Sequence, residues 1–360
     1  MGRGEMQHLP TDIIINILSR LPVKTLSRLR CVSPLWRTLI STPHFLSTHH
    51  DRAAEQPSSL FSTRGQYQRD GSFIIHISSV DHKGTVQKTF TKKVSSVVHS
   101  LQSYASLACL IGTGHIYICN PSTEEFITLP QASRGAFHGM DGVGFGYSSS
   151  AKQYKVVHLF YSYSGHEIAD DQVECEVFTL GCEESSWKRI KNCPYHVYFN
   201  PPPFVEGSLH WVIHDYYHNS YDEVILSFDL DREEFRVIPH PECCSTPDYY
   251  RSLLRLVELR GCLCVVKPTQ PSKHSIWMLK DYKNGTWVKE YNLDLAPLGS
   301  YDMFPRAIRS DGAILMEMPR KRLDYYDPGS GTFTKFNRIE VEGGFLFSYY
   351  VESFYSLGST

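Results

Sequence analysis

The ten cysteines are the residues of this chain best suited to metal or redox chemistry, but their spacing argues against both. The two tightest pairs are Cys243-Cys244 and Cys262-x-Cys264. Structural zinc sites usually place two residues between paired thiolates, and neither pair has that gap. Both sulfurs of the second pair would also lie on one face of a strand. We therefore expect reduced, mostly buried thiols and no metal site.

The sequence motifs of known catalytic sites are also missing. The chain has no Gly-x-Ser-x-Gly elbow and no helix with two metal-ligating histidines, and its 17 histidines are scattered. Gly142-Val143-Gly144-Phe145-Gly146 has the composition of a phosphate-binding loop. No helix follows it to present an N-terminus to a phosphate, so we interpret it as a turn that enters a strand. We expect no catalytic residue and no cofactor, and an enzyme is the less favoured alternative.

Residues 1–50 carry a different signal, a mixture of basic and apolar side chains suited to binding a partner. They contain six Lys or Arg residues and two acidic ones, a formal charge of +4 in a chain of net charge −2. Apolar residues recur at helical spacing over 11–20, 23–30 and 33–41. Three short helices cannot bury this much aliphatic surface by themselves. We expect part of it to contact another protein.

A helix-turn-helix DNA-binding domain is an alternative interpretation of these helices, with Arg28, Arg30 and Arg37 on phosphates. The third helix would then read base edges, yet Arg37 is its only charged residue. In addition, the 36 Lys and Arg residues of the chain are balanced by 38 Asp and Glu residues, which does not favour binding to a polyanion. We expect no nucleic-acid partner.

The composition of the whole chain is that of a folded globular protein, with 360 residues of which 41% are hydrophobic and 21% charged. No stretch approaches 18 consecutive apolar residues, and the N-terminal sequence lacks the basic and apolar regions of a secretion signal. We expect no membrane partner and a location in the cytoplasm, the nucleus or both.

After residue 60 the pattern changes to short β-branched and aromatic runs separated by polar turns. One unit recurs five times: a strand, a polar turn, and a return strand that begins with an aromatic residue. These aromatics follow one another at intervals of 61, 48, 52 and 46 residues: Phe126, Trp187, Phe235, Trp287 and Phe333. Such intervals are typical of four-stranded propeller blades. A β-sandwich is the alternative, but five phased copies fit two sheets poorly.

The fold class we expect is therefore α+β multidomain, with three small helices followed by an all-β domain. The β domain is predicted to be a β-propeller of about six blades. A degenerate first blade would lie around Ser72–Thr91, and the alternating run Phe345–Val351 is a candidate for the strand that closes the ring.

Segments that interrupt the repeat are the candidates for target recognition, because loops on a rigid β scaffold commonly carry binding residues. Four segments interrupt it: Tyr161–Asp171, Tyr195–Pro203, Asp215–Asp222 and Pro239–Tyr250. Within them, aromatic side chains mixed with small polar residues favour binding at Tyr198, Phe199, Tyr216, Tyr217 and Tyr221. The alternative is that these are ordinary loops whose aromatics cover the rim of the scaffold.

At the N-terminus the sequence closely resembles an F-box, and the resemblance is dense. It rests on Leu9-Pro10-Thr11-Asp12-Ile13-Ile14, on Ile17-Leu18-Ser19-Arg20-Leu21-Pro22-Val23-Lys24 and on Arg30-Cys31-Val32-Ser33-Pro34-Leu35-Trp36-Arg37-Thr38-Leu39-Ile40. Pro34 departs from the pattern, because lysine is common at that position in the family.

The rest of the chain resembles the F-box-associated, kelch-like domain of a large plant family. The matching signatures are Asn120-Pro121-Ser122-Thr123 before Phe126, Gly144-Phe145-Gly146-Tyr147, and Tyr350-Val351-Glu352-Ser353. One departure is Ser103-Tyr104-Ala105-Ser106-Leu107, where the family often has a glycine-containing strand that opens the second blade. The resemblance implies an F-box at 1–48, a linker at 49–59 and a propeller at 60–360.

These resemblances imply a substrate-recognition subunit of an SCF (Skp–cullin–F-box) ubiquitin ligase. The F-box would bind a Skp-family adaptor and, through it, the cullin and RING subunits, while the β domain would hold an unidentified target protein for ubiquitination and degradation. Such a receptor has no catalytic residue of its own, because it acts by raising the local concentration of the target. A Skp-bound scaffold without a role in degradation is the alternative.

The side chains expected to bind the adaptor are mainly apolar, with basic residues suited to an acidic partner. For the first helix the alternative is that its aliphatic residues only pack against the other helices, and for Trp36 a place in the core of the F-box is favoured. The expected adaptor-binding residues are Leu9, Pro10, Ile13, Ile14, Ile17, Leu18, Leu21, Pro22, Leu26, Arg28, Val32, Trp36 and Leu39.

Overall fold

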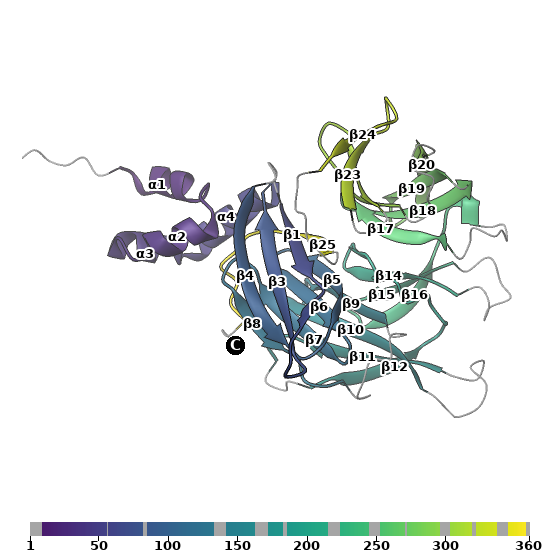
Figure 1. Cartoon of the computed structure of the whole chain (residues 1–360), viewed down its shortest axis with the longest axis horizontal. Helices are drawn as coiled ribbons and strands as arrows, with labels where there is room; N and C mark the ends of the chain where they lie inside the picture. Colours follow the sequence, from purple (N-terminus) through teal and green to yellow (C-terminus); the bar gives the residue numbers. More distant parts are fainter. Residues whose placement is uncertain are drawn as a thin grey trace, which may run out of the picture.

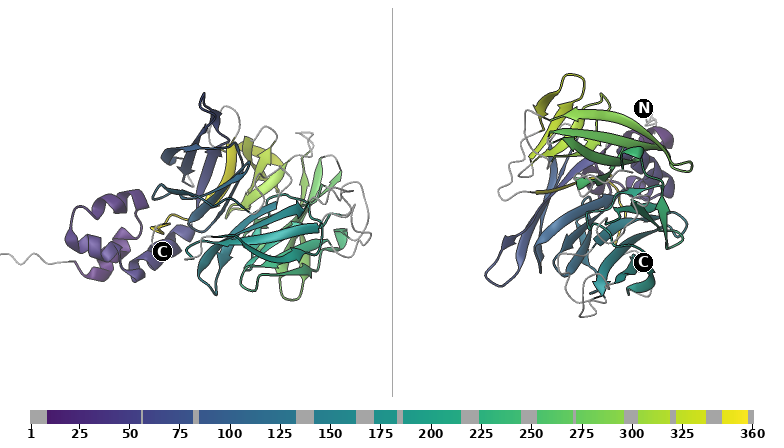
Figure 2. Two further views of the ribbon diagram at one scale, coloured as in Figure 1. Left: turned by 90° about the horizontal axis from the view of Figure 1, so that it is seen from below. Right: turned by 90° about the vertical axis from the view of Figure 1, so that its right-hand side faces the viewer.

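The computed structural model shows a small helical domain followed by a six-bladed β-propeller (Figure 1). The helices extend to one side of the propeller, and the C-terminal end of the chain lies between the two parts (Figure 2). The residues that the structure describes are 9–55, 57–81, 85–132, 142–162, 172–182, 186–214, 224–244, 253–270, 272–295, 303–318, 322–336 and 345–357.

The helical domain contains α1 (Thr11–Leu18), α2 (Val23–Leu29), α3 (Pro34–Ile40) and α4 (Pro43–Glu55). The first three confirm the predicted helices to within two residues at each end. Prolines begin α3 and α4, as expected for a residue whose missing N–H group is not needed in the first turn. The expectation of only three helices is wrong, because α4 occupies most of the segment predicted as a linker.

Two residues explain why the polar-looking segment after Thr42 is helical. The hydroxyl of Thr42 accepts a hydrogen bond from the N–H of Phe45 at 3.2 Å, which caps the first turn of α4. Phe45 and His49 are one turn apart and both buried, so they fix the inner face of the helix. The buried core of the whole helical domain consists of Ile15, Leu18, Leu26, Ile40 and Phe45.

The first three blades of the propeller follow the helices. Blade 1 contains β25 (Phe345–Tyr350), β1 (Ser58–Thr63), β2 (Gln66–Tyr67), β3 (Phe73–Val80) and β4 (Val86–Val94). Blade 2 contains β5 (Val98–Tyr104), β6 (Leu107–Gly112), β7 (His115–Asn120) and β8 (Glu125–Thr128). Blade 3 contains β9 (Gly142–Ser148), β10 (Gln153–Ser162), β11 (Gln172–Thr179) and β12 (Lys188–Cys193).

The remaining three blades repeat the same antiparallel order. Blade 4 contains β13 (Phe204–Val205), β14 (Ser208–Val212), β15 (Ile225–Asp229) and β16 (Glu234–Ile238). A short 3₁₀ helix, η3 (Glu242–Cys244), follows it. Blade 5 contains β17 (Arg255–Leu259), β18 (Cys262–Gln270), β19 (Lys273–Asp281) and β20 (Thr286–Asp294). Blade 6 contains β21 (Phe304–Ile308), β22 (Ile314–Met318), β23 (Arg322–Asp327) and β24 (Thr332–Lys335).

The ring is closed by the C-terminal strand, as predicted. β25 pairs antiparallel with β1, in a register that places Tyr350 opposite Ser58 and Phe345 opposite Thr63. Blade 1 is therefore built from both ends of the β domain, which removes the exposed sheet edges that an open arrangement would leave. Blade 2 is regular despite its departure from the family pattern, since Ala105 and Ser106 form the turn between β5 and β6.

The recurring polar turns have a common structure. In the turns that follow β7, β15, β19 and β23, the side chain of the last strand residue accepts hydrogen bonds from backbone N–H groups two or three residues later. These strand-ending residues are Asn120, Asp229, Asp281 and Asp327. The turn then needs a residue with positive φ, supplied by Glu124, Glu233, Gly285 and Gly331.

The apolar core of the propeller lies between blades. Each of its six clusters combines residues from two neighbouring sheets, as Leu60 and Tyr117 do between blades 1 and 2. Trp187 and Trp287 donate indole hydrogen bonds of 2.9 Å to the carbonyls of Pro130 and Pro239, each of which follows the preceding blade. A blade therefore buries its faces only by stacking against its neighbours, which is the physical basis of the sequence repeat.

The interpretation of the glycine-rich segment at 142–146 as a turn is wrong, because it forms most of β9. A Cβ atom at Gly144 would lie 2.6 Å from Leu209, and one at Gly146 would lie 2.4 Å from Phe204. Both neighbours belong to blade 4. The glycines therefore allow blade 4 to approach the innermost strand of blade 3 closely.

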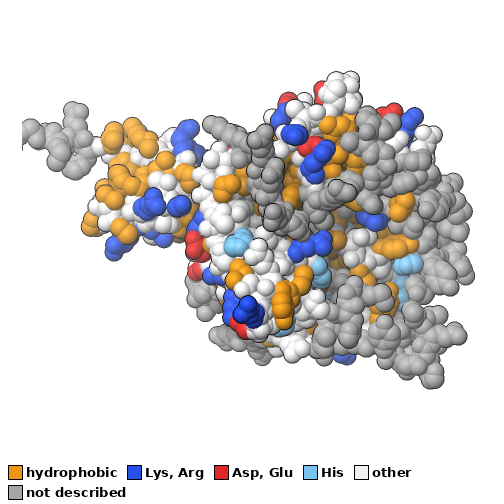
Figure 3. Space-filling view, in the orientation of Figure 1, with side chains coloured by type: hydrophobic (Ala, Val, Ile, Leu, Met, Phe, Trp, Pro, Cys, Tyr) orange, Lys and Arg blue, Asp and Glu red, His pale blue; other side chains and the backbone are white. Residues whose placement is uncertain are grey.

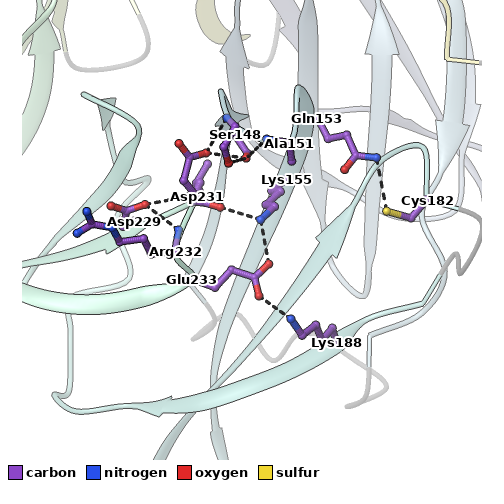
Figure 4. Close-up of polar contacts among 12 residues, drawn as sticks. Ser148, Ala151, Gln153, Lys155, Cys182, Lys188, Asp229, Asp231, Arg232 and Glu233 are labelled. Atoms are coloured by element: carbon purple, nitrogen blue, oxygen red, sulfur yellow. Dashed lines mark hydrogen bonds and ion pairs between the residues drawn. The ribbon is translucent and has the colours of Figure 1, made fainter.

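A partly buried ion pair also joins blades 3 and 4 (Figure 4). The ammonium group of Lys155 on β10 donates hydrogen bonds to Glu233 at 2.9 Å and to the carbonyl of Leu230 at 2.7 Å. Lys188 on β12 contacts the second carboxylate oxygen of Glu233 at 2.8 Å. The two lysines lower the pKa of Glu233 against the opposing effect of burial.

Candidate functional site

Apolar side chains are exposed on the helical domain along a surface that begins at α1. Ile13 and Ile17 are one helical turn apart and are 46% and 52% exposed, and Leu9 continues the row before α1 begins. Val32, between α2 and α3, and Leu35, in the first turn of α3, are also more than half exposed. We call these five residues the helical apolar surface. Exposed aliphatic groups gathered on so small a domain are typical of a protein-binding surface.

The structure divides the predicted adaptor-binding residues into exposed, half-buried and buried sets. The exposed set is Leu9, Pro10, Ile13, Ile17, Pro22, Arg28 and Val32, and the half-buried set is Ile14, Leu21 and Trp36. Leu18, Leu26 and Leu39 are buried, the first two within the core of the helical domain, so in the free chain they support the fold of the F-box and their contact with an adaptor stays a prediction. Leu35 is exposed and was missing from the prediction.

In the view of Figure 3 the helical domain shows basic side chains beside apolar ones. Lys24, Arg28 and Arg37 are exposed, and within the described part of the chain none of them forms an ion pair. Arg37 donates to the carbonyl of Arg30 at 3.2 Å, which holds α3 against the C-terminal end of α2. An acidic surface would complement this arrangement.

The C-terminal tail, residues 351–357, fastens the helical domain to the propeller. Pro22 offers no side-chain cap to α2, and the carboxylate of Glu352 accepts the N–H of Val23 at 3.0 Å in its place. Phe354 packs against the core of the helical domain, with the guanidinium of Arg30 at 4.5 Å from its ring centre. Two residues of the tail thus hold the helices from the propeller side.

Blade 2 holds the other side of this tail. The amide of Asn120 donates to the carbonyls of Ser353 and Tyr355, at 3.2 and 2.6 Å. The carboxylate of Glu125 accepts hydrogen bonds from the Ser356 hydroxyl and the Leu357 N–H. The Asn120-Pro121-Ser122-Thr123 signature therefore begins a turn that binds the chain terminus, a role that sequence reasoning missed because the partners are more than 230 residues apart.

The four segments that interrupt the repeat connect β10 to β11, β12 to β13, β14 to β15 and β16 to β17, and the flanking strand ends lie at one end of the propeller. In antiparallel blades these connections leave from the end opposite to the turns that join β5 to β6 or β7 to β8. The helical domain enters at the turn end, since β1 begins opposite the last residue of β25. The predicted recognition segments thus begin at strand ends directed away from the helices.

Two of the predicted target-binding residues are described, and both take part in packing. Phe199 packs against the core between blades 3 and 4, with its ring 5.2 Å from that of Tyr161. Tyr198 stacks on His214 with ring centres 4.1 Å apart. Each is half-buried. Tyr216, Tyr217 and Tyr221 lie outside the described residues.

The described residues offer little to a metal ion. All ten cysteines are free thiols and six of them are buried, as in Cys119, whose pKa is raised to about 12 by burial. The sulfurs of Cys243 and Cys244 are 3.8 Å apart. Among the described residues, no three His, Cys, Asp or Glu side chains converge.

Several cavities lie on the turn side of the propeller, and two of those of about 400 Å³ or more adjoin its innermost strands. The first, of about 560 Å³, is lined by the innermost strands around the axis, and its cation Arg306 is paired with Glu317 through a 2.6 Å hydrogen bond. The second, of about 400 Å³, lies where α4, blades 2 and 3 and the C-terminal tail meet. No described helix is long and apolar enough to span a membrane.

Comparison with known families decides what this architecture is. Residues 6–48 match the F-box domain and residues 56–349 match the F-box associated beta propeller domain. The chain belongs to the plant F-box proteins with an F-box associated β-propeller domain. This architecture indicates an adaptor or receptor role, in which the F-box binds a Skp-type adaptor in general.

Curated relatives have the same two-part organisation over nearly their full length. F-box protein At3g07870 of Arabidopsis thaliana is 30% identical and covers 92% of this chain and 87% of its own. F-box protein CPR1, from the same plant, is 26% identical over 89% and 82% of the two chains. F-box/kelch-repeat protein At3g23880 of Arabidopsis is 25% identical over 91% and 89%, in keeping with the kelch-like resemblance.

Solved structures share less with this F-box protein. An apocarotenoid oxygenase from Synechocystis is 10% identical, with a TM-score of 0.37 over 65% of this chain and 62% of its own. The tricorn protease is 12% identical, with a TM-score of 0.39 over 80% of this chain and 31% of its own. Likenesses this distant carry no functional argument.

Proposed function

We propose that this F-box protein is the substrate-recognition subunit of an SCF ubiquitin ligase. The helical apolar surface would bind the Skp-family adaptor, which brings the cullin and RING subunits, and the propeller would hold a target protein for ubiquitination. The observation that carries this proposal is the exposure of Ile13 and Ile17 on α1 and of Leu9 just before it. The other face of α1 is already buried in the domain core.

The division of α1 into two faces makes the proposal specific. Ile15 and Leu18 fill the core, so the aliphatic row on the opposite face has no partner among the described residues of this chain. Burying each exposed anchor against an adaptor would contribute roughly 1–3 kcal/mol. The exposed cations Lys24 and Arg28 would then meet acidic groups at the edge of that interface.

Target recognition is proposed for the opposite end of the propeller, on the segments that interrupt the repeat. Their flanking strand ends point away from the helical domain, so a target held there leaves the helical apolar surface free for the adaptor. The aromatic residues Tyr198, Phe199, Tyr216, Tyr217 and Tyr221 are the proposed contacts. Because Tyr198 and Phe199 also pack against the scaffold, their role would be to shape that surface as well as to touch the target.

The experiment is capture of adaptor and cullin from plant cell extract by the intact chain and by Ile13→Asp/Ile17→Asp. The double variant is expected to weaken adaptor capture by at least about 100-fold, because two charged side chains would replace apolar anchors that become buried in the proposed complex. The matched control is Val86→Asp/Val288→Asp, which changes two exposed valines of the propeller and should capture as the intact chain does.

The outcomes separate the ligase receptor from the scaffold alternative. Adaptor and cullin captured together, and lost together in the double variant, support the receptor. Adaptor captured without cullin favours a Skp-bound scaffold with no role in degradation. If a folded intact chain captures neither, or if the double variant captures both as well as the intact chain does, the proposal is wrong.

A further inference from the structure

The cavity between the helical domain and the propeller has the size of a small-molecule site. Its volume of about 400 Å³ falls within the range of ligand-binding pockets. It is lined by parts of the chain that are distant in sequence and come together only in the fold: α4, the turn between β5 and β6, strands β9 and β10, and the C-terminal tail. Residues from these parts include Leu46, His50, Tyr104, Tyr147 and Phe354.

Aromatic rings form a continuous wall on the propeller side of this junction cavity. The ring centres of Tyr104 and Tyr147 are 6.2 Å apart and nearly parallel, at 22°. Tyr154 meets Tyr147 edge to face at 5.0 Å and meets Tyr355 in the same way at 5.2 Å. Phe204 supports the first ring from behind, with its centre 4.6 Å from that of Tyr104. Rings fixed in this way offer flat apolar surface at little cost in side-chain entropy.

The described residues that line the cavity include no Lys, Arg, Asp or Glu. Of its two histidines, His49 donates through Nε2 to the carbonyl of Leu21 at 3.0 Å, and burial lowers its pKa, so its ring is neutral near pH 7. The tyrosines and Ser106 would offer hydroxyl groups as polar contacts to a ligand. A charged ligand would lose its hydration here without gaining a counter-charge.

The turn that borders the cavity differs from the corresponding turns of three other blades. Between the first two strands, those turns contain Glu206-Gly207 in blade 4, Arg260-Gly261 in blade 5 and Asp311-Gly312 in blade 6. Blade 2 has Ala105-Ser106 there, preceded by Tyr104 at the end of β5. The turn thus carries small, uncharged residues where those three blades carry a charged residue and glycine.

We propose that the junction cavity binds an uncharged, flat aromatic small molecule. This inference goes beyond the receptor role and does not depend on adaptor binding. Because the ligand would contact α4, the tail and two blades together, its binding would stabilise one orientation of the helical domain relative to the propeller. It would therefore fix the adaptor-binding helical domain against the propeller.

The test uses three pyrene probes that share a flat ring system and differ in charge. Fluorescence titration of the intact chain with 1-pyrenemethanol is expected to show saturable binding, with the emission of a probe in an apolar environment. Binding of 1-pyrenecarboxylate and of 1-pyrenemethylammonium should be at least tenfold weaker, because the cavity lacks a counter-charge for either.

Two variants locate the probe, each with a matched control. His50→Trp fills the cavity from the surface of α4 and should weaken binding at least tenfold, whereas Asp51→Trp, on the next and more exposed position, should not change it. Tyr104→Ser removes part of the ring wall and should weaken binding about fivefold, whereas Tyr67→Ser changes an exposed tyrosine of blade 1 and should have no effect.

Several results would overturn the inference. They are the absence of saturable 1-pyrenemethanol binding to the folded intact chain, equal binding of the three probes, and unchanged binding in both His50→Trp and Tyr104→Ser. Adaptor capture by the same preparations is measured in parallel. Failure of capture with probe binding retained would count against the receptor proposal alone.

Discussion

The helical domain and the propeller bury their apolar residues in opposite ways. The propeller places a cluster at each of its six blade interfaces and closes the ring with β25, so each sheet face is covered by a neighbour. The helical domain has one small core and leaves Ile13 and Ile17 exposed, and it draws on Phe354 from the C-terminal tail to complete its packing. The propeller therefore covers its own apolar faces, while the helical domain depends on the C-terminal tail and on a partner to cover its faces.

This difference shows how one chain can combine a rigid scaffold with a small domain that binds a partner. A closed ring gives the recognition segments rigid strand ends, since every blade is held on both sides. A small domain with an unfilled apolar face gains most of its remaining stability only when a partner covers that face. The tail keeps the two parts in contact through Glu352 and Phe354 on one side and Asn120 on the other.

The largest expected effect concerns the core of the helical domain. Phe45 is fully buried, so Phe45→Ala should cost about 3–5 kcal/mol and unfold the helices while the propeller remains folded. Hydrogen exchange, measured strand by strand, would show protection lost in α1–α4 and kept in the β strands. Leu35→Ala, at an exposed position of the same domain, serves as control and should change stability by less than about 0.5 kcal/mol. Equal loss of protection in both parts would show that they unfold as one unit.

The next effect should be confined to the propeller. Glu233→Gln leaves the ammonium of Lys155 with a neutral partner in a largely buried place and should destabilise the propeller by about 3 kcal/mol in urea unfolding. Adding Lys155→Met should restore part of that loss, because the uncompensated charge is then removed. The control is Glu290→Gln, which breaks the more exposed pair with Lys280 and should cost under about 1 kcal/mol. A double variant no more stable than the single one would contradict this account.

The smallest expected effect is the pH dependence of stability, and it too should be confined to the propeller. His210 is buried in blade 4, where the Tyr282 hydroxyl lies 2.7 Å from Nε2, and burial lowers its pKa to about 4 from an ordinary value of 6.5. The unfolded chain therefore binds the proton more tightly, and stability contributed by neutral His210 is lost as pH falls below about 6.5 and levels off near 4. Between pH 7 and 5 this loss should be roughly 1–2 kcal/mol for the propeller.

His210→Gln tests that assignment, since glutamine does not titrate in this range. Urea unfolding of the propeller at pH 7 and at pH 5 should show a smaller difference in the variant than in the intact chain. His115→Gln, at a partly exposed position of the β6–β7 hairpin, is the control and should leave the difference unchanged. An unaltered pH dependence in His210→Gln would mean that other groups produce it.

Local patterns predicted much of this architecture. The spacing of apolar residues gave three helices, and the recurring turn with its following aromatic gave the propeller, because each blade repeats the same local requirements for a turn and a packed return strand. The failures have physical causes as well. α4 was missed because its surface is polar, although Thr42 caps it and Phe45 anchors it. The glycines of β9 resembled a turn because the neighbour that requires them, Phe204, lies in another blade.

Local sequence patterns predict the candidate sites less well than they predict the fold. The sequence identified the aliphatic residues of the F-box, but Ile17 and Leu18 are adjacent and of similar type, and only helix packing decided that Ile17 is exposed while Leu18 is buried. Local sequence by itself determined the elements, the repeat and the family, because these depend on residues near one another in the chain. The tertiary structure alone decided which apolar residues remain free, that the tail joins Asn120 to the helices, and that Tyr104 and Phe354 border one cavity. Those outcomes depend on contacts between residues tens to hundreds of positions apart, which no local pattern records.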